Sequence, residues 1–164
     1  MHNLPGPRGL YDPRFERDAC GVSFVANIKG VRSHDIVSKG LRALCNLEHR
    51  GATGAEETTG DGAGILIQVP HEFLVAVAPF ALPAAGSYAV GMAFLPADSS
   101  ACEKAEAAIE SIVAEEGLTS LGWRVVPTNP SILGKTALSV MPTVKLFFLS
   151  DAAGAAGLAL DREA

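Results

Sequence analysis

Between Glu72 and Asp98 the chain carries no charged side chain. A run of this length is long enough to cross a lipid bilayer, so it is either a membrane span or part of a buried core. Pro79, Pro83 and Pro96 decide between the two, because a proline inside a helix removes a hydrogen bond and clashes with the preceding turn, at a cost of about 3 kcal/mol. We therefore expect a helix, a turn and a buried strand here, and no membrane association.

Strand-like and helix-like stretches alternate along the rest of the chain. Runs of β-branched and aromatic residues indicate strands, whereas apolar residues at a spacing of three or four indicate helices. The pattern predicts strands at 20–28, 63–69, 88–95, 123–126 and 143–149, and helices at 34–48, 71–77 and 101–116. Residues 49–62 are predicted as a loop, and 132–140 fit either class. This alternation favours a layered α/β sandwich over a helix bundle.

Local signals set the expected ends and faces of these elements. Lys29-Gly30 is expected to form a turn, and Gly117 is expected to cap the helix before it. The apolar stripe of that helix is predicted to face the core and consists of Ala105, Ala108, Ile109, Ile112 and Val113.

Composition excludes several classes of protein. The 164 residues are 48% hydrophobic and 19% charged, which is typical of one globular domain rather than of a disordered chain. The net charge is −5 and no basic cluster is present, so a nucleic-acid-binding surface is not expected. Residues 1–19 lack the apolar core of a signal peptide, and we expect a cytoplasmic protein.

The three cysteines, Cys20, Cys45 and Cys102, form no CxxC pair and have no histidine at zinc-ligand spacing. Neither a metal site nor a disulfide is therefore expected. Free cysteines usually pack inside proteins. We expect this of Cys45, which lies beside Leu44 on its helix, and of Cys102 near the start of another helix.

Cys20 has a second interpretation, because it opens the first predicted strand directly after residues 1–19. One cut before it would place its thiol and a free α-amine on the same residue. The pKa of an α-amine is about 7.7–8 and that of a free thiol about 8.5, so the amine is suited to act as the base for the thiol. This is the pairing of an N-terminal nucleophile, which needs no separate catalytic histidine. The alternative is a cysteine that only packs in the core.

Two further strings stand in the predicted loop. Arg50, followed by Gly51, is either a planar fork for a carboxylate or a solvated surface charge. Gly60-Asp61-Gly62 is not a P-loop, since no Gly-Lys-Ser/Thr follows, and no helix follows as in a dinucleotide-binding turn. Its glycines indicate either a tight turn or a close approach of the backbone to a neighbour or a small ligand.

Together these strings resemble the class II glutamine amidotransferase domain that begins the large (alpha) subunit of glutamate synthases. The resemblance runs from about residue 9 to about residue 145. It is carried by Cys20-Gly21-Val22, Leu47-Glu48-His49-Arg50-Gly51, Gly60-Asp61-Gly62-Ala63-Gly64-Ile65, Gly9-Leu10-Tyr11-Asp12-Pro13, Glu16-Arg17-Asp18-Ala19, Gly122-Trp123-Arg124-Val125-Val126-Pro127 and Leu133-Gly134.

The resemblance implies a fold, a domain organisation and a reaction. The fold would be α+β, the four-layer αββα sandwich of N-terminal-nucleophile hydrolases, incomplete at its C-terminal side. Residues 1–19 would be a propeptide, and 20–164 the N-terminal portion of the amidotransferase domain. Cys20 would attack the side-chain amide of glutamine, release ammonia and form a thioester that water converts to glutamate. Arg50 and Gly51 would bind substrate or organise the site beside the loop of Gly60, Asp61 and Gly62.

The same resemblance places the remaining chemistry outside this chain. In glutamate synthases the ammonia aminates 2-oxoglutarate at a distant site that uses FMN and an iron–sulfur cluster, with electrons from NADPH, NADH or ferredoxin. Those cofactors bind to segments absent here, so none is expected in this chain. The expected partners are glutamine, the rest of the large subunit and the small subunit. The resemblance places the reaction in glutamate biosynthesis and ammonia assimilation.

The sequence also departs from the family. The Asn-Gly pair of the oxyanion hole and the aspartate that holds the substrate amine lie beyond residue 164, and Leu146 stands near an expected glutamine. Because losing one oxyanion donor costs about 10²–10³ in rate, we expect little glutaminase activity from the isolated chain. The alternatives are an inactive truncated remnant, an interaction module, or another class II amidotransferase such as a purine-pathway enzyme. The leader and the Gly-Trp-Arg string favour glutamate synthase.

Overall fold

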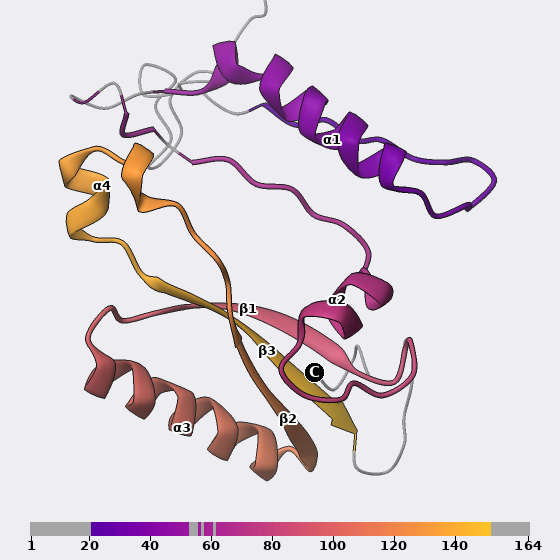
Figure 1. Ribbon diagram of the computed structural model, residues 1–164, viewed down its shortest axis with the longest axis vertical. Helices are drawn as coiled ribbons and strands as arrows, with labels where there is room; N and C mark the ends of the chain where they lie inside the picture. The colour runs from indigo at the N-terminus through magenta and orange to yellow at the C-terminus, as the bar shows by residue number, and fades with distance from the viewer. Residues whose placement is uncertain (1–20, 53–55, 57, 61, 152–164) are drawn as a thin grey trace, which may run out of the picture. The chain divides into compact units, whose positions relative to one another are not determined.

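The computed structural model describes residues 21–52, 56, 58–60 and 62–151 (Figure 1). The chain divides into two compact units, an N-terminal unit of residues 1–66 and a C-terminal unit of residues 67–164. The propeptide predicted at 1–19, the nucleophile Cys20 and the loop residue Asp61 lie outside the described residues.

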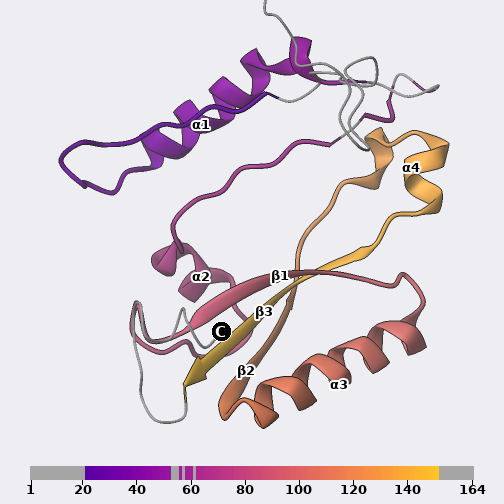
Figure 2. The same ribbon diagram turned by 180° about the vertical axis from the view of Figure 1, so that it is seen from behind.

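The N-terminal unit is built on helix α1, His34–Asn46, which continues into the short 3-10 helix η2, Glu48–Arg50. The predicted helix therefore ends slightly earlier than expected and tightens into a different turn. Residues 21–27 run back alongside α1, as both views show (Figures 1 and 2). The turn between them is the predicted one, with the Gly30 amide donating to the Asn27 carbonyl at 2.9 Å.

The strands predicted at 20–28 and 63–69 are wrong for the described part of those ranges. Both segments are extended, but neither pairs with a neighbouring strand (Figure 1). Their apolar side chains are exposed rather than buried, including Val22, Phe24 and Leu66. The residue pattern favours an extended backbone, whereas a strand exists only where a neighbouring segment completes its hydrogen bonds.

The C-terminal unit holds an antiparallel sheet of three strands, in the order β1-β3-β2. These strands are β1, Ala89–Leu95, β2, Leu118–Val125, and β3, Thr143–Asp151. All three were predicted, but β2 begins earlier than expected. Thr143 opposes Leu95 and Leu149 opposes Ala89 at the two ends of the β1–β3 pair. Beyond β2 the ambiguous region folds as a 3-10 helix, Pro130–Ile132, and a short helix α4, Lys135–Ser139.

Helices cover both faces of this sheet, because successive strand residues point to opposite sides. Phe147 and Leu149 of β3 pack with Val113 of helix α3, Ser99–Glu115. Phe148 between them is fully buried on the other face against Leu74 of helix α2, His71–Val77. The sheet thus has one small core on each side.

The face of α3 that meets the sheet differs from the predicted stripe. Cys102 and Val113 are buried and Ile109 packs on the core, whereas Ala108 and Ile112 are exposed. The helix begins slightly earlier than the predicted residue 101, and the Asp98 side chain before it accepts a hydrogen bond from the Ala101 amide at 2.8 Å. Gly117 follows with a φ of +75°.

The uncharged stretch between Glu72 and Asp98 contains the predicted helix, turn and strand as α2, a turn and β1. The prediction that this strand is buried is wrong for most of β1, because Met92 and Phe94 are exposed and only Leu95 at its end is buried. Across the described ranges, no helix combines the length and the apolar character that a membrane crossing needs.

Candidate functional site

The best-supported site lies in the N-terminal unit, where Gly21 packs against the turn that follows α1. A methyl group placed on Gly21 would lie 3.2 Å from the Cβ of Arg50 and 3.2 Å from the Cδ2 of Leu47. Contacts this short show that the backbone of residue 21 rests directly on the turn. The residue next to Cys20 and the predicted site residue Arg50 are therefore neighbours in space.

The glycine-rich loop contacts the residue that follows this turn, Ala52. The Cβ position of Gly60 lies 3.6 Å from the backbone oxygen of Ala52, which is ordinary van der Waals contact. Gly62 has nothing within 4 Å of its Cβ position and a φ of +92°, which fits the tight-turn alternative at that residue. Residues 50–52 thus link Gly21 to Gly60, two parts of the chain that the sequence analysis singled out separately.

Backbone hydrogen bonds hold this turn in shape. The Arg50 amide donates to the Leu47 carbonyl at 2.8 Å, and the Gly51 amide donates to the Glu48 carbonyl at 3.0 Å. His49 adds a side-chain bond, in which Nδ1 donates to the Asn46 carbonyl at 3.0 Å. The turn is therefore a fixed surface rather than a loose connection.

The other described histidines have partners within their own units. The hydroxyl of Ser38 lies 3.2 Å from Nδ1 of His34, one helical turn away on α1. Nδ1 of His71 lies 3.0 Å from the Tyr88 hydroxyl, and burial raises the pKa of that phenol. In the described part of the chain, then, each histidine has a local structural contact, as expected if none of them serves the nucleophile.

The two described cysteines differ from each other. Cys102 is buried, as predicted, whereas the prediction that Cys45 packs in the core is wrong because this residue is exposed. Cys45 lies on α1, where the apolar pattern of Leu44 and its neighbours did not reveal which side of the helix the cysteine occupies.

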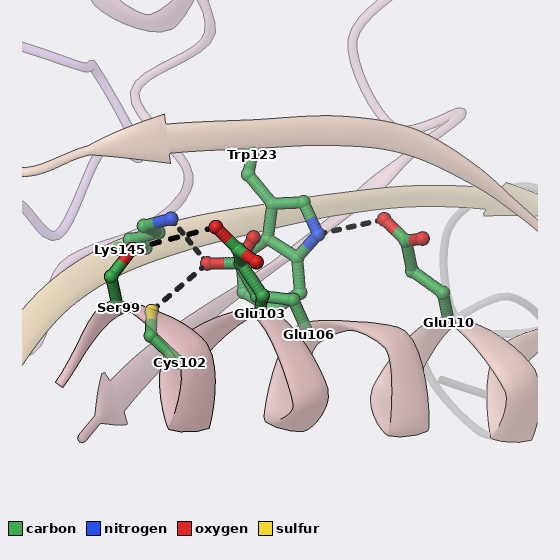
Figure 3. A network of polar contacts seen from close by, with 7 residues as sticks. All are labelled: Ser99, Cys102, Glu103, Glu106, Glu110, Trp123 and Lys145. Atoms are coloured by element: carbon green, nitrogen blue, oxygen red, sulfur yellow. Dashed lines mark hydrogen bonds and ion pairs between the residues drawn. The ribbon is translucent and has the colours of Figure 1, made fainter.

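Sequence reasoning missed a polar network between α3 and the sheet (Figure 3). The Glu106 carboxylate accepts hydrogen bonds from the Lys145 ammonium and, at 3.3 Å, from the Cys102 thiol. Farther along the helix, the Trp123 indole donates to Glu110 at 2.8 Å. No motif marks this network, because Lys145 and Glu106 are far apart in the sequence.

The network holds Cys102 in its thiol form. Burial raises the pKa of Cys102, and its hydrogen bond to Glu106 raises the pKa further. Burial also acts to raise the pKa of Glu106, but the hydrogen bonds from Lys145 and Cys102 outweigh it and lower the pKa. Because the thiolate is the reactive form, the raised pKa and the burial of Cys102 agree with its predicted structural role. In these described ranges no group of three or more histidine, cysteine, aspartate and glutamate residues is placed to hold a metal ion.

Comparison with known protein families identifies the family to which this chain belongs. The family model for class II glutamine amidotransferases matches residues 20–164, beginning at the candidate nucleophile. The chain belongs to the class II glutamine amidotransferases. This confirms the family inferred from the strings around Cys20, Arg50 and Gly60, and the mixed α/β structure agrees with it at that coarse level.

Curated relatives of this amidotransferase are glutamate synthases. It is 41% identical over 149 residues to the NADPH glutamate synthase large chain of Bacillus subtilis, covering 90% of this chain and 10% of that one. It is 43% identical to the NADH glutamate synthase of Schizosaccharomyces pombe, covering 86% and 7%, and 42% identical to ferredoxin-dependent glutamate synthase 2 of Synechocystis, covering 90% and 10%. The chain thus spans about a tenth or less of the length of these relatives.

Proposed function

We propose that this chain supplies the glutamine-hydrolysing chemistry of a glutamate synthase, with Cys20 as the nucleophile. The observation that carries the proposal is the family match, which begins at Cys20. The contact between Gly21 and Arg50 supports it, because it brings the residue beside the nucleophile to the arginine that the sequence analysis associated with the site.

The proposed reaction starts with a cut before Cys20 that frees its α-amine and removes residues 1–19 as a propeptide. The amine accepts the thiol proton, and the thiolate attacks the side-chain amide carbon of glutamine. The amide nitrogen leaves as ammonia after taking up that proton, and a glutamyl thioester remains. Water then attacks the thioester, giving glutamate and restoring the thiol.

The residues of the α1 turn and the glycine-rich loop complete the proposed site. The planar guanidinium of Arg50 suits the carboxylate of glutamine, because two parallel hydrogen bonds fix both its position and its orientation. Gly51 continues the turn toward Ala52, whose carbonyl neighbours Gly60. We assign the segment Gly60-Asp61-Gly62 the role of a substrate-facing loop, because glycines have no side chain that would keep a ligand away from the backbone.

The proposal extends to the fold and to the larger protein. We propose that residues 20–164 belong to a four-layer αββα sandwich. The antiparallel sheet with α3 packed on one face supports this, and α2 covers part of the other face. The ammonia would serve a synthase site with FMN and an iron–sulfur cluster, held by other parts of the large subunit and assisted by the small subunit.

Intact mass and active-site labelling test this function together. A chain that begins at Cys20 shows that the cut has occurred. The glutamine analogue 6-diazo-5-oxo-L-norleucine should then label Cys20, and glutamine should protect it. Cys20→Ala should abolish labelling, whereas the control Cys45→Ala, at an exposed cysteine, should keep it. Ammonia release is not the readout, because little glutaminase activity is expected from the isolated chain. Failure to label Cys20 would reject the proposal and favour an inactive binding module.

A further inference from the structure

Leu47 occupies a junction in the N-terminal unit. Its amide donates to the Leu44 carbonyl at 3.0 Å and closes α1, while its carbonyl accepts from the Arg50 amide at 2.8 Å and opens η2. Its backbone is thus tied to both helices.

The side chain of Leu47 faces the start of the amidotransferase segment. A methyl group on Gly21 would meet Leu47 twice, at 3.2 Å from Cδ2 and 3.3 Å from Cβ, and would meet the Cβ of Arg50 at 3.2 Å. Three contacts within this narrow range leave no room for a side chain at residue 21 unless the turn gives way. An added methyl group would require Leu47 or Arg50 to shift by a few tenths of an ångström.

We infer that Leu47 is a positioning residue for the nucleophile. Its side chain packs against the backbone at Gly21 and thereby sets where the Cys20 thiol meets the substrate. The inference rests on the proposed role of Cys20. A single peptide bond joins residues 20 and 21, so a displacement of Gly21 is transmitted to the nucleophile. Displacements of about 1 Å can cost about 100-fold in rate, even though such a residue touches no substrate.

The experiment uses saturation kinetics of labelling by 6-diazo-5-oxo-L-norleucine. In this reaction the carbon that carries the diazo group takes up a proton. The thiolate then attacks this carbon and displaces nitrogen gas, so the product is a thioether. The maximal rate constant reports alignment, and the half-saturating concentration reports binding. Iodoacetamide, which needs no alignment, measures the intrinsic reactivity of the same thiol. Peptide mass spectrometry assigns each label to Cys20, and intact mass checks that every chain compared begins there.

Four single variants separate positioning from folding. Gly21→Ala adds a methyl group that would press on Leu47. Leu47→Ala removes most of the side chain that contacts Gly21, and Leu47→Met keeps most of the volume of that side chain. Gly40→Ala is the matched control, because its added methyl would also lie 3.2 Å from a leucine-sized side chain, the Cδ1 of Ile65, within the same unit. Circular dichroism verifies that each variant keeps its helices.

The expected result is a drop of about tenfold or more in the maximal labelling rate for Gly21→Ala and Leu47→Ala. Half-saturation and the iodoacetamide rate should stay within about threefold of wild type, and Leu47→Met and Gly40→Ala should label normally. The double variant Gly21→Ala/Leu47→Ala should lose less than the two single losses multiplied, because the shortened side chain makes room for the added methyl.

Two results would overturn the inference, and they are distinguishable from failure of the proposed function. If wild type labels at Cys20 and both Gly21→Ala and Leu47→Ala label at the wild-type rate, Leu47 does not position the nucleophile. If the variants lose iodoacetamide reactivity to the same extent, the effect is on folding or on the thiol itself. If wild type does not label at all, the proposed function fails first and the inference falls with it.

Discussion

The Glu106 carboxylate on α3 accepts a hydrogen bond from the Lys145 ammonium on β3, and both side chains are only 19% exposed. Lys145 belongs to the central strand of the sheet, so this ion pair joins the helix to the middle of the C-terminal unit. The pairing has opposite effects on the two groups: hydrogen bonding to Glu106 raises the pKa of Lys145, whereas the bonds from Lys145 and Cys102 hold the pKa of Glu106 down against the effect of burial.

Glu106→Gln should lower the free energy of unfolding of the C-terminal unit by about 1 kcal/mol at neutral pH, because it leaves the Lys145 ammonium without its charged partner. Urea unfolding followed by tryptophan fluorescence measures this change, since Trp123 is the only tryptophan of the chain and its ring lies 4.4 Å from that of Phe147 in the core of this unit. Glu103→Gln is the matched control on an exposed position of the same helix, and it should change little.

Acidification should remove the same contribution. A carboxyl group whose folded pKa is lowered stabilises the fold above its ordinary pKa of about 4.3, and the contribution is lost as the pH falls through the lower folded value. Wild type should therefore lose stability on acidification more steeply than Glu106→Gln, and the two should converge once the pH is below the lowered folded pKa of Glu106. The raised pKa of Lys145 gives the mirror effect, present below about pH 10.4 and lost as the pH rises through the folded value. A gap between wild type and variant that is the same at all pH values would contradict this assignment.

The sequence predicts an element well when the interactions that determine it come from residues nearby in the chain. Helix α2 was predicted with its exact ends, and α3 and Gly117 were placed closely, because caps and periodicity act within a few residues. The sheet-facing side of α3 was misjudged because Lys145, which draws Glu106 toward the sheet, comes from a distant strand. The strands predicted at 20–28 and 63–69 show the same limit, since their composition indicates an extended backbone but does not specify a pairing partner.

For the candidate site, too, the sequence identified individual residues but not the contacts between them. Short strings identified Gly21, Arg50 and Gly60 as residues of interest, and their roles in the site stay a prediction. Their contact depends on where the chain turns after α1, and the role of Leu47 in that contact carries no sequence signal, because a leucine at the end of an amphipathic helix is ordinary.

The two described thiols should react in a fixed order. Exposed Cys45 should be alkylated by iodoacetamide in the folded protein, whereas Cys102 should react only after unfolding, because it is buried and its pKa is raised. Peptide mass spectrometry at increasing urea concentrations checks this order. Labelling of Cys102 below the unfolding transition seen by Trp123 fluorescence would show that α3 opens locally.

Phe148→Ala should be far more damaging than the same change at Phe94. Phe148 is fully buried between Leu74 and Tyr88, so its truncation should lower the free energy of unfolding by about 3–5 kcal/mol. Phe94 lies on the adjacent strand β1 but is 69% exposed, and its truncation should cost less than about 0.5 kcal/mol. Urea unfolding of both variants makes the comparison. Similar losses for the two would mean that the exposed half of this sheet face is covered in solution.

Gly122→Ala should also destabilise the C-terminal unit strongly. Gly122 follows an irregularity in the pairing of β2 with β3 and has a φ of +135°, a conformation that residues with a side chain rarely adopt. An added methyl would lie 2.8 Å from the Cε1 atom of Phe80, whose ring packs edge-on against Phe148 at 5.3 Å between ring centres. Backbone strain and the displaced ring together should cost about 2–4 kcal/mol in urea unfolding.

Two companion variants separate the sources of that loss. Gly91→Ala on β1 is the control, because nothing lies within 4 Å of its Cβ position, and it should leave stability unchanged or slightly higher. Phe80→Leu removes the ring that blocks the methyl at residue 122, so the double variant Gly122→Ala/Phe80→Leu should be more stable than the sum of the single losses predicts. Strictly additive losses would show that backbone strain alone, and not the packing of Phe80, requires glycine at this position.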